Sequence, residues 1–163
     1  MMFPISPSKK LSFQSYNAKF KEDILQLFYS NCPKYFDPID EKELIDFLDN
    51  YADENYLVVL EGEKVIGCGG HYTKDRKHGI AWVFFERYVI GQKKLFHYAD
   101  VFYKEIERRM TAEGHFYDVE IHTTQLLERF FNRYGFNTVE IKKDGFGEGL
   151  HAYTMKKILN PIA

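Results

Sequence analysis

Cysteine is scarce in this sequence, and its scarcity argues against two kinds of site. The chain has two cysteines among its 163 residues, Cys32 and Cys68, and they stand far apart. A disulfide framework or a structural zinc site needs more cysteines at closer spacing. We therefore expect neither, and we expect a reduced, cytoplasmic setting. The histidines also lack metal-ligand spacing, so we predict no metal site.

Long apolar stretches and a strong net charge are missing as well. No segment approaches the roughly 20 apolar residues that a membrane-spanning helix needs, and the first residues lack the apolar core of a signal peptide. The net charge is −2 at pH 7, which provides no general attraction to nucleic acid or to a membrane surface. We expect a soluble protein that binds neither.

The composition that remains is typical of a globular protein. Hydrophobic residues make up 45% of the chain and charged residues 28%, and 163 residues are enough to bury a sizeable core. Most of the 15 phenylalanines and 12 tyrosines must build that core. No internal repeat, low-complexity tract or linker divides the sequence. We predict a single domain over residues 1–163.

Hydrophobic spacing and turn residues predict an alternating series of strands and helices. Strands are expected at 11–16, 56–60, 65–72, 80–85, 115–122, 136–142 and 151–158. Helices are expected at 20–31, 41–51, 92–113 and 124–134. In the strand 80–85, period-two alternation places Ile80, Trp82 and Phe84 on one face. Both faces are apolar, so we expect this strand to be central and covered on both sides.

The most informative stretch is the strand–helix–strand segment around Gly135. Thr124 is placed to cap the start of its helix, and Gly135 to supply the left-handed residue that ends it. The helix carries one apolar stripe at helical spacing, formed by Leu127, Phe130, Phe131 and Tyr134.

This segment and the order of elements resemble the GNAT superfamily of N-acetyltransferases, whose late helix typically reads Phe-Tyr-x-x-x-Gly-Phe. The resemblance covers nearly the whole chain. It implies an α+β fold in α/β/α layers, with a mixed, mostly antiparallel sheet of about seven strands and about four helices. It also implies that acetyl-coenzyme A donates an acetyl group directly to an amine of a small molecule or a peptide. The segment 144–155 resembles the end of superfamily members that have Phe-Phe in the late helix.

The same resemblance indicates where the cofactor binds. Its phosphates are expected on the loop between the strand 80–85 and the long helix, where the family reads Gln/Arg-x-x-Gly-x-Gly/Ala. Alignment on Leu95 puts Arg87, Ile90 and Gln92 at the motif positions. A shift by one puts Gly91 at the second glycine position, but it replaces Arg87 by Glu86 and Ile90 by Val89. The residues expected to bind the cofactor are Val83, Phe84, Phe85, Arg87, Val89, Ile90, Gly91, Gln92, Lys93, Thr124 and Phe131.

Two lysines at the start of the long helix leave two interpretations open. Lys93 and Lys94 lie in the first turn, where the helix dipole disfavours a cation by roughly 0.3–1 kcal/mol. A bound pyrophosphate would reverse that effect. The alternative is that both side chains simply point into water.

Acetyl transfer to a lysine-like amine, with a pKa of about 10.4, calls for a base. Glu120 and His122 share a strand face with Asp118, which is either solvated or lines a polar pocket; Glu86 is an alternative base. The tyrosine that donates a proton to the leaving thiolate in many GNAT enzymes is replaced by Phe131. Tyr134, one turn later, either takes that role or packs locally. The candidate catalytic residues are Glu120, His122, Tyr134 and Glu86.

The acceptor and the overall function also leave alternatives. Tyr35 and Phe36, between the first two helices, either contact the acceptor or face the core. The leading hypothesis is an acetyl-coenzyme A-dependent N-acetyltransferase. The alternatives are a GNAT-like coenzyme A-binding module with weak or lost catalysis, and a structural domain that forms dimers without a cofactor. A homodimer is plausible because the C-terminal strands are rich in aromatic residues.

Overall fold

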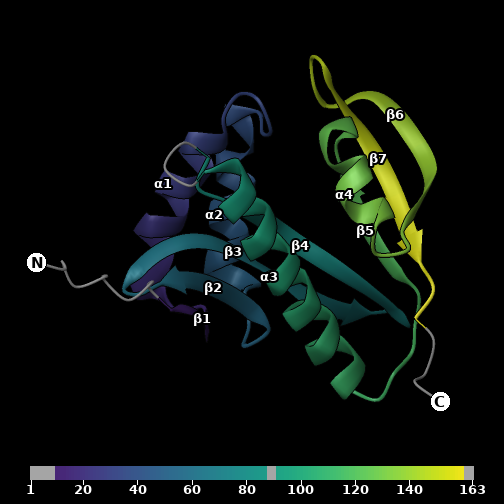
Figure 1. Cartoon of the computed structure of the whole chain (residues 1–163). Coiled ribbons are helices and arrows are strands. Elements are labelled where there is room, and N and C mark those ends of the chain that lie inside the picture. Colours follow the sequence, from purple (N-terminus) through teal and green to yellow (C-terminus); the bar gives the residue numbers. More distant parts are fainter. Residues whose placement is uncertain (1–9, 88–90, 160–163) are drawn as a thin grey trace, which may run out of the picture.

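The computed structural model describes residues 10–87 and 91–159, apart from the side chain of Gln92. A seven-stranded sheet with the order β1-β2-β3-β4-β5-β7-β6 runs through it, and only β4 and β5 pair in parallel (Figure 1). The strands are β1 (Leu11–Ser15), β2 (Tyr56–Glu61), β3 (Lys64–Lys74), β4 (Lys77–Phe85), β5 (Val119–Thr123), β6 (Asn137–Gly147) and β7 (Leu150–Lys157). The α-helices are α1 (Lys21–Asn31), α2 (Glu41–Asn50), α3 (Gln92–Ala112) and α4 (Glu128–Asn132). The predicted α+β fold class is confirmed.

The helices cover both faces of the sheet and enclose two hydrophobic cores. On one face, α3 and α4 pack over the strands, and Phe102, Ile106 and Met110 of α3 are almost completely buried there. On the other face, α1 and α2 contribute Ile24, Phe28 and Leu44 to the second core. These layers agree with the expected α/β/α arrangement. Among the described helices, none combines the length and the hydropathy needed to cross a membrane.

Strand β4 lies between the two cores, as its apolar faces predict, but its alternation is shifted. Trp82 and Phe84 face the core under α1 and α2. Ile80 was expected beside them and instead faces α3, together with Val83 and Phe85. The cause is a bulge, because Trp82 has a φ of +44° and the β3–β4 register shifts next to it. The extra residue at the bulge interrupts the alternation, so side chains before and after it do not share the face that strict alternation predicts.

The segment around Gly135 has the predicted caps and a shorter helix. The Thr124 side chain accepts a hydrogen bond from the Leu126 N–H at 3.3 Å, and Gly135 has a φ of +92°. The first residues of the expected helix form a 3-10 turn, so the α-helix itself is limited to Glu128–Asn132. Strand β5 begins at Val119 rather than at residue 115, while β6 continues to Gly147.

Candidate active site

The parallel strands β4 and β5 diverge at the centre of the sheet. They pair at two positions only, His78 with Val119 and Gly79 with Glu120. Beyond Gly79, β4 pairs with β3 alone, while β5 continues against β7. The sheet therefore splits along the C-terminal half of β4, and α3 crosses the split on one face (Figure 1).

The backbone at the end of β4 is turned partly toward this split. The Glu86 N–H donates to the Ile66 carbonyl in β3 at 2.9 Å. Because successive residues of a strand face opposite ways, the N–H and C=O of Phe85 point away from β3. The Phe85 carbonyl accepts from the buried Asn31 amide at 2.7 Å. The predicted cofactor residues Val83, Phe84 and Phe85 thus lie on the stretch of β4 that has no partner in β5.

The bulge at Trp82 is held in place by side chains on the α1–α2 face of the sheet. The Tyr56 hydroxyl donates to the Trp82 carbonyl at 2.8 Å, and the Trp82 ring stacks on Phe36 with centroids 5.9 Å apart. Phe36 is also packed against the second core, so the connector between α1 and α2 supports the bulge. Its neighbour Tyr35 is half-buried, and the Arg87 guanidinium lies 5.4 Å from its ring centre.

Glu120 is the centre of a polar group on the sheet face opposite α3. Its side chain is 24% exposed, with Lys77 at 3.7 Å, Lys156 at 3.8 Å and the exposed His122 at 3.5 Å. Burial, and after it the charge of Glu120, raises the pKa of Tyr72. The Glu120 carboxylate is therefore half-buried and has lysines beside it. This environment is intermediate between the solvated face and the enclosed pocket that the sequence left open.

Tyr72 is a member of this face that the sequence did not single out. It stands opposite Gly79 in the β3–β4 pair. A Cβ at Gly79 would lie 2.3 Å from the Tyr72 ring, so the glycine makes room for that ring. The available signal was Gly79 directly before the predicted strand 80–85, because a glycine in a strand often marks a close approach.

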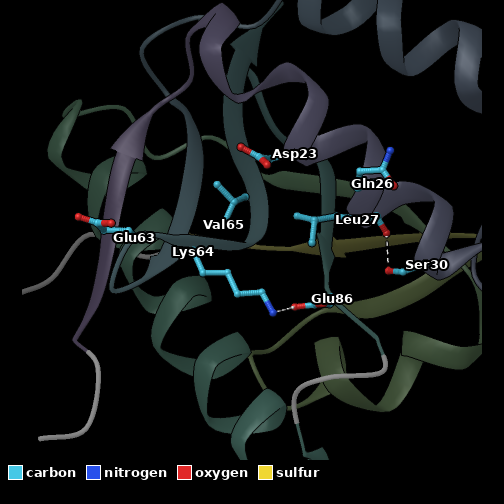
Figure 2. A pocket seen from close by; sticks show the side chains of 8 residues that line it. All are labelled: Asp23, Gln26, Leu27, Ser30, Glu63, Lys64, Val65 and Glu86. Atoms are coloured by element: carbon cyan, nitrogen blue, oxygen red, sulfur yellow. Dashed lines mark hydrogen bonds and ion pairs between the residues drawn. The ribbon is translucent and has the colours of Figure 1, made fainter.

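Glu86 lies at the other end of β4 from Glu120. Its carboxylate forms an ion pair with Lys64 at 3.0 Å and borders a pocket of about 260 Å³ between α1 and the start of β3 (Figure 2). From Gly79, the partner of Glu120, to Glu86 the strand advances roughly 20 Å at about 3.3 Å per residue. The two candidate bases are therefore too far apart to act on the same amine.

Phe131 and Tyr134 both pack in the core under α3. Phe131 is buried against Phe136, with ring centroids 5.6 Å apart. The Tyr134 hydroxyl donates a short hydrogen bond to Asp100 of α3, and its ring lies 4.1 Å from that of Tyr103. Burial, followed by the bond to Asp100, raises the pKa of Tyr134, so the hydroxyl is protonated at neutral pH.

The start of α3 carries the remaining predicted cofactor residues. Gly91 is the residue before the first helical turn and provides no side-chain cap. Lys93 is exposed, whereas Lys94 is 2.6 Å from the carboxylate of Glu61 at the end of β2. Val89 and Ile90 lie outside the described residues, as does the side chain of Gln92. Of the two lysines, Lys94 thus forms an ion pair within the protein, and the local sequence did not indicate its partner, Glu61.

No protein-family model matches this sequence, and no curated protein matches it. Solved structures do match the fold. Ard1 from Thermoplasma volcanium has a TM-score of 0.68 at 15% identity, covering 93% of this chain and 99% of its own. An acetyltransferase of the GNAT family from Staphylococcus aureus has a TM-score of 0.70 at 12% identity, covering 93% and 100%. A chain of the NatC complex bound to Gag peptide and CoA has a TM-score of 0.66 at 11% identity, covering 93% and 99%. This protein therefore has the GNAT acetyltransferase fold.

Proposed function

We propose that this protein is an N-acetyltransferase that transfers the acetyl group of acetyl-coenzyme A directly to an amine of a small molecule or a peptide. The observation that carries the proposal is the split between β4 and β5, which leaves one edge of Val83–Phe85 without a β5 partner. The likeness to a solved structure that holds CoA and a peptide supports the same reading. Such a split offers backbone N–H and C=O groups to an extended, amide-containing ligand such as pantetheine.

The residues around the split suggest a role for each part of the cofactor. Pantetheine would lie along Val83–Phe85. The phosphates would lie at the start of α3, near Gly91, Lys93 and Arg87, because N–H groups at a helix start bind anions. From the other side, Thr124 and Phe131 would border the thioester arm.

In the proposed reaction Glu120 accepts the proton that the ammonium group loses. The neutral nitrogen attacks the thioester carbonyl and the C–S bond breaks. The new C–N bond leaves a positively charged nitrogen, which gives its second proton to the departing sulfur, so the products are the amide and the coenzyme A thiol. His122, 3.5 Å from the Glu120 carboxylate, would help pass the proton to water. Because the thiol has a pKa near 8.5, its thiolate leaves more readily than an alkoxide and depends less on a proton donor. Glu120 rather than Glu86 is the proposed base, because Glu120 lies on the face where Trp82 and Phe36 would meet an acceptor.

A second candidate is a coenzyme A-binding module with weak or lost catalysis. Phe131 has no hydroxyl, and the Tyr134 hydroxyl is already bonded to Asp100. Two measurements separate the candidates. Calorimetric titration with acetyl-coenzyme A should show binding at micromolar to high-micromolar concentration for either candidate function. The absence of binding would reject both candidates. Release of free thiol from acetyl-coenzyme A over a panel of amines and peptides should occur only for the enzyme.

Three further expectations remain predictions. They are a cytoplasmic setting, in keeping with the free thiols of Cys32 and Cys68, a single domain over residues 1–163, and a possible homodimer. Sedimentation velocity tests the last.

A further inference from the structure

The turn between β2 and β3, residues 61–64, contacts both ends of the connection that leads from β4 to α3. Lys64 reaches the Glu86 carboxylate, directly after β4, at 3.0 Å (Figure 2). Glu61 accepts from Lys94, in the first turn of α3, at 2.6 Å. One short turn thus holds the first residue after β4 and the first turn of α3 by two separate ion pairs.

These ion pairs are better anchored than pairs between two exposed side chains. The carboxylates of Glu61 and Glu86 are only 16% and 17% exposed, although their lysine partners are about half exposed. The buried Tyr98 hydroxyl donates a second, short hydrogen bond to Glu61. The backbone of Glu86 is also fixed, by its hydrogen bond to Ile66 in β3. The Glu61 carboxylate, which is mostly buried and bonded twice, holds its lysine in one place more firmly than a freely solvated carboxylate would.

We propose that the β2–β3 turn positions the phosphate-binding end of the coenzyme A site without touching the cofactor. This role rests on the proposed function, because it concerns the cofactor of that reaction. N–H groups at the start of α3 bind an anion only when they are aimed at one point. The two ion pairs fix the end of β4 relative to the start of α3, so less order has to be imposed when coenzyme A binds. Glu61 and Lys64 are therefore positioning residues.

Charge alone leads to the opposite expectation for Glu61. Coenzyme A is a polyanion, and a carboxylate near its phosphates repels it. If Glu61 acted only through its charge, its removal would free Lys94 and tighten binding. If Glu61 positions the start of α3, its removal weakens binding in spite of the improved charge. The sign of the change in affinity therefore separates the two roles.

The test is calorimetric titration of coenzyme A into the wild type, Glu61→Gln and Glu63→Gln. Glu63→Gln is the matched control, because it removes the same charge from an exposed position of the same turn. We expect Glu61→Gln to weaken binding about five- to tenfold and Glu63→Gln to stay within about twofold of the wild type. Equal or tighter binding by Glu61→Gln overturns the positioning role while the proposed function stands. A wild type that binds no coenzyme A overturns the proposed function and this role with it.

A reversed ion pair separates positioning from general damage to the fold. Glu61→Lys alone should weaken coenzyme A binding, whereas Glu61→Lys combined with Lys94→Glu re-forms a pair of the same net charge. We expect the combined variant to bind within about threefold of the wild type, as coupled residues that restore one contact do. A combined variant no better than Glu61→Lys alone contradicts the positioning role. So does a single Glu61→Lys variant that binds more tightly than the wild type.

Discussion

At the scale of single residues, the hydroxyl groups near α4 bear most directly on mechanism. Phe131 stands where many GNAT enzymes carry a tyrosine, and it is buried among other aromatic rings. Tyr134 has a hydroxyl, but this group donates a hydrogen bond to Asp100, and the ring packs on Tyr103. These contacts give Tyr134 a structural role, because they join the end of α4 to α3.

We predict that Tyr134→Phe lowers the stability of the fold and spares the reaction. The variant loses the bond to Asp100, so the free energy of unfolding should fall by about 1 kcal/mol. Asp100 also has Lys104 as a partner at 3.0 Å, so it keeps one contact. Urea denaturation measures the stability, and thiol release from acetyl-coenzyme A measures the reaction. A fall in turnover of tenfold or more, with little change in stability, would instead assign acid catalysis to Tyr134.

A second prediction at this scale concerns Glu120. Glu120→Gln removes the proposed base, so turnover should fall about a hundredfold, in the range usual for general bases. The affinity for coenzyme A should stay the same, because this carboxylate lies far from the phosphate end of the site. Glu140→Gln is the control, since Glu140 is an exposed carboxylate of the nearby β6. Equal turnover by Glu120→Gln and Glu140→Gln would remove Glu120 from the mechanism.

At the scale of elements, helix α3 is attached to β3 and its neighbours at both ends. Its first turn is held by Glu61 through Lys94. At its other end, the Glu113 carboxylate lies 2.6 Å from His71 and accepts from Thr73 at 3.1 Å. His71 is almost fully buried and the Glu113 side chain is 31% exposed, so this second attachment joins the interior to the surface. Together the two attachments hold α3 across the split between β4 and β5.

We predict that the second attachment depends on pH. Burial alone would raise the pKa of Glu113, but the bonds from His71 and Thr73 outweigh it and leave the pKa below its usual value. A lowered folded-state pKa contributes stability above the unfolded value of about 4.3, and that contribution is lost as the pH falls through the folded-state pKa. The wild type should therefore be more stable than Glu113→Gln at pH 6 to 7, and the difference should shrink toward pH 3. Urea denaturation across this range measures it, and a difference that does not change with pH would contradict the assignment.

At the scale of the whole molecule, the fold sets its single tryptophan beside the proposed site. Trp82 forms the bulge of β4, stacks on Phe36 from the α1–α2 side, and precedes the stretch Val83–Phe85, which has no partner in β5. Its ring packs in the core under α1 and α2, beyond the point where β4 loses its pairing with β5. A ligand that enters the split changes the surroundings of the only indole in the chain.

We therefore predict that coenzyme A changes the intrinsic tryptophan fluorescence in a saturable way. The dissociation constant from fluorescence should match the calorimetric value, because both report the same site. Trp82→Phe should abolish the fluorescence change and leave a measurable heat of binding. Binding seen by calorimetry without any change in the wild-type fluorescence would place the cofactor away from the split.

Local sequence was enough to predict most of the elements of this protein. The caps at Thr124 and Gly135 and the long helix expected at 92–113 follow from turn chemistry and from a period of about 3.6 residues, which depend on neighbours in the chain. The order of elements, once recognised, also pointed to the GNAT fold. The start of β5 and the length of α4 were less well predicted, because element ends depend on what packs against them.

The sequence by itself determined the elements, their order and the residue types available for chemistry, because hydrophobic period and turn propensity act over a few residues. Only the tertiary structure decided that the bulge at Trp82 exchanges the faces of β4, that Glu61 holds Lys94, and that Glu120 and Glu86 lie at opposite ends of one strand. Each of these depends on strand register or on an ion pair between residues distant in the chain. Such contacts form only when the sheet and helices pack together, and no local pattern records them.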